Sequence, residues 1–139
     1  MKKRVLLAMV LPAFMAACSS TGGDMNKVTE AQLAQNWVLT SIDGQQVAKD
    51  ESAPTLNLNA AMEANGFAGC NRYFGKAELK DGKLRLDNMG MTRMACAEPE
   101  MKLEDSVAKS LSDWSAVSVK GGQMTLTSGE HSLVFAPAK

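Results

Sequence analysis

The sequence predicts a mostly antiparallel β-sheet or barrel that carries one amphipathic helix. Segments with the two-residue alternation of β-strands recur about every ten residues, with tight turns between them. Two Asp-Gly pairs, at residues 43–44 and 81–82, are strong hairpin signals. A single segment, residues 99–112, has its apolar side chains at helical spacing instead. With 139 residues, of which 45% are apolar, the chain fits one domain with one hydrophobic core.

The first expected elements lie before residue 70. A short helical lead-in is expected at residues 31–36, followed by a strand at 37–42 that runs into the Asp43-Gly44 turn. Residues 55–58 alternate with period two, and residues 62–67 do so less regularly.

Two further groups of strands are expected after residue 75. Residues 76–79 and 83–86 flank the Asp81-Gly82 turn and should pair as a hairpin, with one buried face made by Leu79, Leu84 and Leu86. The strand-like segments near the end of the chain, separated by glycine-containing turns, predict a three-stranded meander with strands at residues 117–120, 124–127 and 132–135.

The segment 99–112 predicts the amphipathic helix. Pro99 and several acidic side chains stand at its start, as is typical of helix N-termini: Glu98, Glu100, Glu104 and Asp105. Its apolar stripe contains Leu103, Val107, Leu111 and Trp114. We expect this stripe to pack on the sheet, and binding of a partner is the alternative use.

Residues 1–17 read MKKRVLLAMVLPAFMAA and predict a lipoprotein signal peptide. The apolar run follows three basic residues and is too short to span a bilayer, which needs roughly 20 apolar residues. The four residues MAAC at 15–18 resemble the bacterial lipobox, whose cysteine is acylated and becomes the new N-terminus. Met15 stands where leucine is usual, and an ordinary signal peptide with an unrelated cysteine is the alternative.

Acylation of Cys18 would anchor the protein to a membrane. Residues 18–30 would then form the acylated N-terminus and a flexible, polar tether. Ser19 after the cysteine resembles the signal for sorting to the outer membrane of a Gram-negative bacterium. The expected location is therefore the periplasmic face of the outer membrane, with lipid anchoring.

The two remaining cysteines are Cys70 and Cys96. An even pair in an oxidising compartment favours a disulfide, and two buried free thiols are the alternative. The chain has no Cys-x-x-Cys motif for redox chemistry. A zinc site would need more ligands than these, because His131 is the only histidine. No metal site is therefore expected.

Two motifs surround these cysteines, GCNRYFG at residues 69–75 and MTRMACA at residues 91–97. Together with Trp37, the Asp43-Gly44 turn and Pro99, they resemble the META domain family. The resemblance implies a META-like domain at residues 31–139 with an α+β, mostly antiparallel fold. It implies a cracked or partly open β-barrel with one helix, like the barrel of secretion pilotins. It also implies an envelope protein linked to heat shock and to novobiocin tolerance, with no established catalytic mechanism.

Several residues of these motifs are candidates for a partner or ligand surface: Asn71, Arg72, Met91, Arg93 and Met94. Methionines 89, 91 and 94 could line an adaptable apolar groove, although packing in the core is the favoured alternative. The two arginines could bind an anionic headgroup or a carboxylate, or they could be solvated. Asn71 could also cap or turn the backbone through its amide.

The sequence gives no support to catalysis. It has no Gly-x-Ser-x-Gly motif, phosphate-binding loop, His-Glu-x-x-His motif or calcium loop, and we expect His131 to be an exposed edge residue. Fifteen basic residues balance fifteen acidic ones, so a nucleic-acid partner is not indicated. We expect a monomer without a cofactor.

Three functions fit these observations. The first is an outer-membrane-anchored stress lipoprotein that supports envelope integrity and novobiocin tolerance by non-catalytic binding of an envelope protein or lipid. The second is an inhibitor of an envelope-directed hydrolase such as lysozyme, with the Asn88–Ala97 loop entering the enzyme's cleft. The third is a purely structural lipoprotein.

Overall fold

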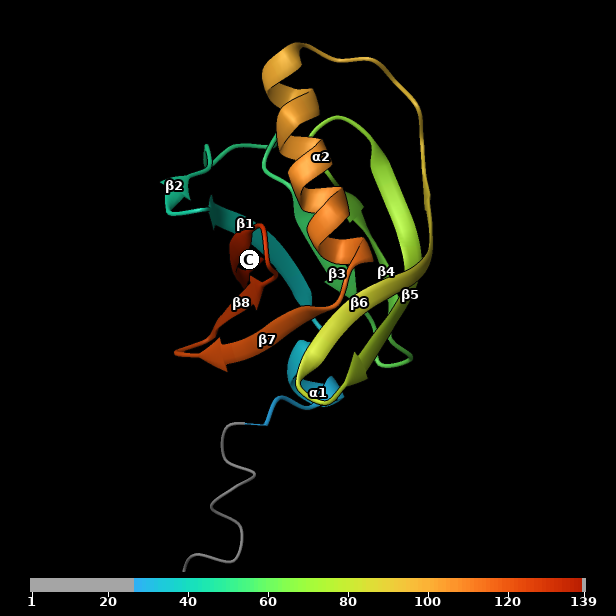
Figure 1. Ribbon diagram of the computed structural model, residues 1–139, viewed down its shortest axis with the longest axis vertical. Coiled ribbons are helices and arrows are strands. Elements are labelled where there is room, and N and C mark those ends of the chain that lie inside the picture. Colours follow the sequence, from blue (N-terminus) through green and yellow to red (C-terminus); the bar gives the residue numbers. More distant parts are fainter. Residues whose placement is uncertain (1–26, 139) are drawn as a thin grey trace, which may run out of the picture.

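The computed structural model describes residues 27–138, and Figure 1 shows how their helices and strands are arranged. The expected signal peptide at 1–17, Cys18 and the expected tether through residue 26 lie outside the described residues. The helices are α1 (Glu30–Leu33) and α2 (Glu98–Ser112). The strands are β1 (Asn36–Ile42), β2 (Gln45–Gln46), β3 (Thr55–Leu58), β4 (Glu63–Phe67), β5 (Arg72–Lys80), β6 (Lys83–Met91), β7 (Ser115–Lys120), β8 (Gln123–Thr127) and β9 (Ser132–Pro137).

The strands form a closed antiparallel barrel. From β3 to β9 each strand pairs with the next along the chain, and β1 pairs with both β3 and β9. Strands β1 and β3–β9 therefore close a barrel of eight, and β2 is an extra strand beside β1. The antiparallel barrel with a long amphipathic helix, as the sequence predicted, is confirmed.

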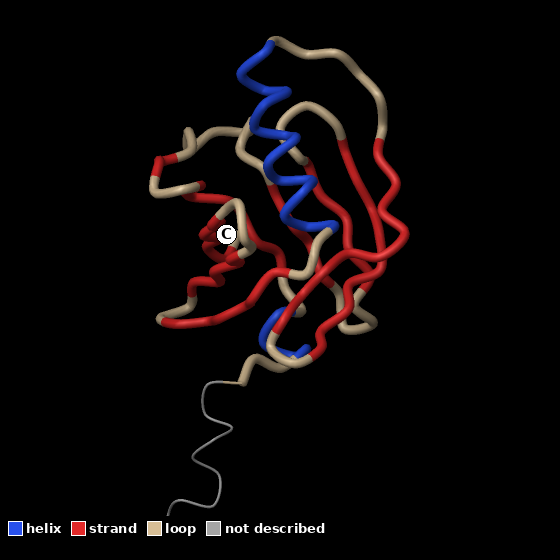
Figure 2. Tube along the Cα trace, viewed as in Figure 1, coloured by secondary structure: helices blue, strands red, loops and turns tan. Residues whose placement is uncertain are grey.

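The barrel ladder is short between β6 and β7. These strands pair at just two positions, Lys83 with Ala116 and Leu84 with Ser115. The pairing of β5 with β6 continues much further, as far as Tyr73 with Met91. The second half of β6 therefore diverges from β7, and α2 lies beside it (Figures 1 and 2). The barrel nevertheless stays closed, because Lys83–Ala116 and Leu84–Ser115 keep β6 and β7 paired, so it is not the cracked or partly open barrel that the family resemblance implied.

The two Asp-Gly turns form as predicted. Asp43 and Gly44 have φ angles of 51° and 81°, and Asp81 and Gly82 have φ angles of 52° and 74°. Positive φ at both central residues is what the two-residue hairpin turn requires. The first turn leads into β2, which has only two residues, and the second joins the nine-residue strands β5 and β6. The terminal meander of β7, β8 and β9 is likewise confirmed.

The core fills the barrel interior, and α1 lies at one end of it (Figure 1). Trp37 is fully buried, and its indole N–H donates to the carbonyl oxygen of Leu33 at 3.0 Å. The helical lead-in ends at Leu33 because β1 already begins at Asn36. Val28 is also in the core, 6% exposed, so the folded body begins before residue 31.

Helix α2 begins one residue earlier than the predicted range and ends at the predicted residue. Val107 and Leu111 are buried in the core, as expected from the apolar stripe. Trp114 lies beyond the helix end, where its ring stacks against the Arg85 guanidinium with 4.6 Å between the guanidinium carbon and the ring centroid. Glu104 lies on the buried face, although the sequence had grouped it with the N-terminal acids.

Candidate functional site

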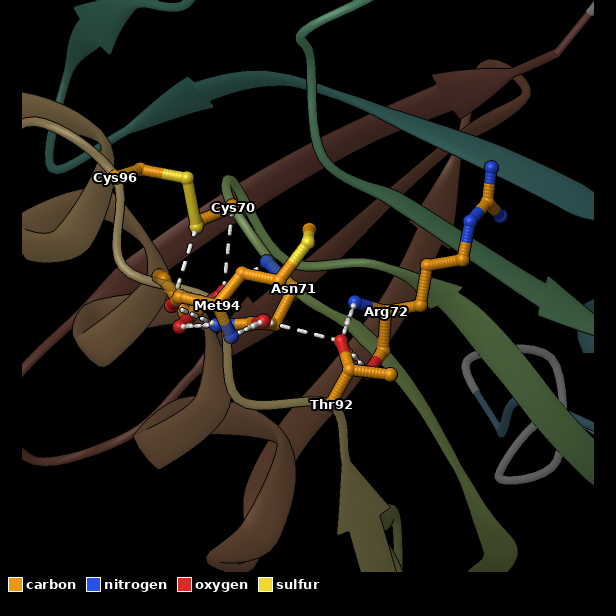
Figure 3. Close-up of a disulfide and its surroundings, with 7 residues drawn as sticks. Cys70, Asn71, Arg72, Thr92, Met94 and Cys96 are labelled. Atoms are coloured by element: carbon orange, nitrogen blue, oxygen red, sulfur yellow. Dashed lines mark hydrogen bonds between the residues drawn. A yellow bond between two sulfur atoms is a disulfide. The ribbon is translucent and has the colours of Figure 1, made fainter.

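The site lies where β5 begins and where the connector, residues 92–97, joins β6 to α2 (Figure 3). Asn71 is 2% exposed at this point. Its Nδ2 group donates to the carbonyl oxygen of Met94 at 3.1 Å, and its Oδ1 atom accepts from Met94 N at 2.6 Å. Oδ1 also accepts from the Thr92 hydroxyl at 3.0 Å. The Asn71 amide therefore fixes the backbone of the connector.

Glu104 completes this network from α2. Its Oε1 atom accepts from the backbone N–H groups of Cys70, at 3.2 Å, and of Asn71, at 2.5 Å. Its Oε2 atom accepts from Asn71 Nδ2 at 2.8 Å. The carboxylate is only 4% exposed, and these three donors compensate for its loss of hydration. We call Asn71, Glu104, Thr92 and Met94 the Asn71–Glu104 network.

Gly69 allows the helix to come this close. A Cβ atom at Gly69 would lie 3.1 Å from the carbonyl oxygen of Glu100 and 3.2 Å from Glu104 N. Its φ of 131° is also unfavourable for a residue with a side chain. The glycine of the first motif therefore serves the contact between α2 and the start of β5.

Cys70 and Cys96 form a disulfide across a sequence separation of 26 residues. Cys70 is buried at 3%, whereas Cys96 is exposed at the end of the connector. The bond ties the connector to the start of β5 at a second point, next to the bonds of Asn71 (Figure 3). The disulfide and the Asn71–Glu104 network together hold the connector in one position.

A groove of about 680 Å³ opens beside this connector. Four methionines from three segments line it, and we call it the methionine groove: Met89 and Met91 of β6, Met94 of the connector and Met101 of α2. Met89 and Met91 also pack against the core, and Met94 is 60% exposed. The structure therefore contains an apolar groove lined by Met89, Met91 and Met94. From the sequence alone, core packing had been favoured over this groove.

The five candidate residues do not form one surface. Asn71 lines the methionine groove, but it is 2% exposed and its amide is fully hydrogen-bonded, so it positions the connector and offers no free polar group. Arg72 directly precedes the buried Tyr73 on β5, so the two side chains point to opposite faces of the strand. Tyr73 pairs with Met91 of β6. Arg72 therefore faces the outside of the barrel, and its side chain extends away from the disulfide (Figure 3). Met91, Arg93 and Met94 do line the methionine groove together.

The expected Asn88–Ala97 loop is not a projecting loop. Residues 88–91 belong to β6, and the connector is bound to β5 by Asn71, by the Thr92–Arg72 backbone bond of 3.0 Å and by the disulfide. A loop that enters a hydrolase cleft has to stand clear of the body. The inhibitor hypothesis therefore has no specific support from this segment.

His131 differs from the expected exposed edge residue. Its side chain is 22% exposed, and Nδ1 lies 2.8 Å from the Asp43 carboxylate. This hydrogen bond, followed by the Ser132 N–H bond at 2.9 Å, lowers the pKa of Asp43 below its ordinary value of 3.8. The pair joins the β1–β2 turn to the start of β9, far along the chain from the methionine groove.

Residues 27–138 contain neither a cluster of the usual metal-binding side chains nor a membrane-spanning helix. Within this range no group of three or more His, Cys, Asp or Glu side chains is arranged to hold a metal ion. None of the helices in the same range is long and apolar enough to cross a membrane.

Sequence reasoning missed Glu104 as a site residue. The signal was present, because Glu104 lies three residues before Val107 and seven before Leu111, on the same helical face. An acidic residue in a buried stripe points to a partner with N–H donors. That partner, the backbone of residues 70–71, is remote in the sequence and could not be identified from it.

Comparison with known proteins gives concordant results. The family model described as META domain matches residues 30–139. Heat shock protein HslJ of Escherichia coli (strain K12) is 31% identical over 135 residues, covering 96% of this chain and 94% of that protein. An NMR structure of a protein from Burkholderia xenovorans is 29% identical, with a TM-score of 0.61 over 100% of this chain and 99% of that one. A second NMR structure, also 29% identical, has a TM-score of 0.70 over 79% of this chain and 95% of that one. The chain belongs to the META domain family.

Proposed function

We propose that this protein is a stress-related lipoprotein of the bacterial envelope that binds an apolar segment of another envelope protein without catalysing a reaction. The observation that carries the proposal is the methionine groove. Its four flexible, polarisable side chains can repack around different apolar partners. Arg93, which also lines the groove, can pair with an acidic group at the edge of the bound segment.

The fold supports a binding role because it keeps the groove open and in place. The groove lies between β6 and α2, and the connector that borders it is fixed at two points, by Asn71 and by the disulfide. A site whose backbone is already ordered loses less entropy when it binds a partner. The polar groups of Asn71 and Glu104 are already satisfied, so the free surface offered to a partner is chiefly apolar.

The membrane anchor and the stress role are part of the proposal. Acylation at Cys18 would hold the domain on the periplasmic face of the outer membrane, where misfolding envelope proteins expose apolar segments. The name of the relative HslJ, a heat shock protein, supports a role under stress. Tolerance of novobiocin would then follow from an intact envelope and not from binding of the drug, because the groove lacks convergent free polar groups.

The test is retention of envelope proteins on the immobilised full chain, with detergent-solubilised envelope from heat-stressed cells. We expect wild type and a Met91→Leu/Met94→Leu variant to retain the same protein in stoichiometric amount. A Met91→Lys/Met94→Lys variant should lose it, since two charges in the groove oppose apolar binding. Denaturant unfolding of each variant checks the fold. Retention by the wild type and both variants alike, or retention of lipid alone, would contradict the proposal.

A further inference from the structure

The methionines of the described chain divide into two groups. Met62 is 4% exposed and Met124 is fully buried, and both belong to the hydrophobic core. The other four all line the methionine groove. A methionine that only fills space has no reason to be exposed, yet Met94 is 60% exposed beside three others. Their shared property is the thioether sulfur.

The backbone brings these thioethers to one place from three segments. Met89 and Met91 are two residues apart on β6, so they lie on the same face of the strand. Met94 is fixed by Asn71 through both its N–H and its carbonyl oxygen, at 2.6 and 3.1 Å. Met101 is in the first turn of α2, where its N–H bonds to Ala97 O at 3.1 Å. The donors therefore stand on an ordered framework although their side chains are flexible.

The chemistry of this donor set is specific. Thioethers are soft, neutral ligands that favour Cu(I) and its congener Ag(I) over hard divalent cations. The carboxylate in the groove, that of Glu104, is occupied by three N–H donors, and Arg93 repels a doubly charged ion twice as strongly as a singly charged one. Within residues 27–138 the cysteines and the histidine already have partners, since Cys70 and Cys96 form the disulfide and His131 pairs with Asp43.

We propose that Met89, Met91 and Met94, assisted by Met101, form a binding site for a soft monovalent metal ion, Cu(I) or Ag(I). The site does not depend on the proposed binding of a protein segment. Because a thioether has no proton to lose, binding should not change with pH where a histidine or thiol site would weaken as the pH falls.

The test is a titration of the full chain with Ag(I), followed by NMR of the ¹³C-labelled methionine methyl groups. Every sample carries Cys18→Ser, because a free thiol would bind the ion. We expect the methyl signals of the four groove methionines to shift, and those of Met62 and Met124 to stay in place. The affinity should be the same at about pH 7.5 and about pH 5.5, a range that spans the ordinary histidine pKa.

Leucine variants separate metal binding from the apolar character of the groove. Met91→Leu and Met94→Leu should each weaken Ag(I) binding by about tenfold or more, because loss of even an outer-shell partner typically costs 10–100-fold in affinity. Met62→Leu, in the core, is the matched control and should bind as wild type does. Shifts confined to other methionines, equal affinity of the groove variants, or weaker binding at the lower pH would overturn the metal site. Retention of the protein partner by the same leucine variants tests the proposed function separately.

Discussion

At the residue scale, two buried polar side chains organise the site. Asn71 and Glu104 lie 33 residues apart in the sequence, and each satisfies hydrogen-bonding groups that the other's segment brings in. Glu104 accepts from three N–H donors with its two carboxyl oxygens, and each of these donors is buried. The position of the connector therefore depends on the side-chain amide of Asn71 and on the carboxyl group of Glu104, which holds that amide in place.

Glu104→Gln should destabilise the fold by about 2–4 kcal/mol. Glutamine offers one acceptor oxygen where the carboxylate has two, so at least one buried donor loses its partner. Denaturant unfolding measures the change. The matched control is Glu98→Gln on the same helix, because Glu98 makes an exposed ion pair with Lys102 at 3.2 Å that contributes little. Equal stability of the two variants would contradict this account of Glu104.

Gly66→Ala should also be strongly destabilising, by about 3 kcal/mol or more. A Cβ atom there would overlap the backbone carbonyl of Thr55 and lie 2.7 Å from the Tyr73 hydroxyl, which donates to that carbonyl at 2.5 Å. Gly90→Ala is the comparison, since its Cβ would meet the ring of Phe74, which is 62% exposed and can move away. Thermal unfolding of both variants should therefore give a clearly larger loss for Gly66→Ala.

At the element scale, the connector and α2 lie on the side of the barrel where β6 diverges from β7. β6 and β7 pair at two positions only. The position of α2 therefore depends on the packing of its side chains in the core and on the attachment of its N-terminal end to β5. The disulfide contributes to that attachment by linking the connector to β5.

Reduction of the disulfide should lower stability by about 3–4 kcal/mol in the chain-entropy model for a loop of this length. Urea unfolding of the wild type with and without a thiol reductant measures the change. A Cys70→Ala/Cys96→Ala variant should resemble the reduced protein and show no response to the reductant. Amide exchange should increase first in the connector, because it loses one of its two attachments. A uniform increase over the whole barrel would contradict this local role.

At the scale of the whole molecule, the pairing of β1 with β9 closes the barrel. This seam runs from Trp37 paired with Pro137 to Ile42 paired with Leu133. Asp43 extends it by one position, through its own N–H to Ser132 O at 2.8 Å and through its carboxylate to Ser132 N and His131.

The seam predicts a dependence on pH. The pKa of Asp43 is lower in the folded state than its ordinary value of 3.8, so its carboxylate stabilises the fold above that pH. The contribution is lost as the pH falls through the lowered value. Asp43→Asn should therefore be less stable than wild type at about pH 7, and the difference should shrink at about pH 3. Urea midpoints at both pH values measure it.

The control for this prediction is Asp81→Asn. Asp81 has the same turn position in the β5–β6 hairpin, with a φ of 52°, and among the described residues no partner like His131 bonds its carboxylate. Its substitution should leave the difference between the two pH values as in wild type. An identical pH response of the two variants would show that the Asp43–His131 pair does not stabilise the seam.

Local patterns in the sequence determined most of the elements. The Asp-Gly pairs determined the two hairpin turns, because positive φ is a property of the turn residues themselves. The alternation at 55–58 and the helical spacing at 99–112 likewise depend on near neighbours in the chain. The paired motifs around Cys70 and Cys96 identified the family, since they are contiguous strings of residues.

Only the tertiary structure decided what depends on distant segments. The closure of β1 on β9 and the burial of Glu104 against residues 70–71 both join residues far apart in the chain. The four methionines lie close together at residues 89–101, but the packing of α2 beside β6 decided that their side chains line a groove. The outward direction of Arg72 followed from the pairing of its neighbour Tyr73 with Met91 inside the barrel. The motif contains Tyr73 but carries no information on this pairing. Local propensity acts over a few residues, whereas register and burial are set by the packing of the whole barrel.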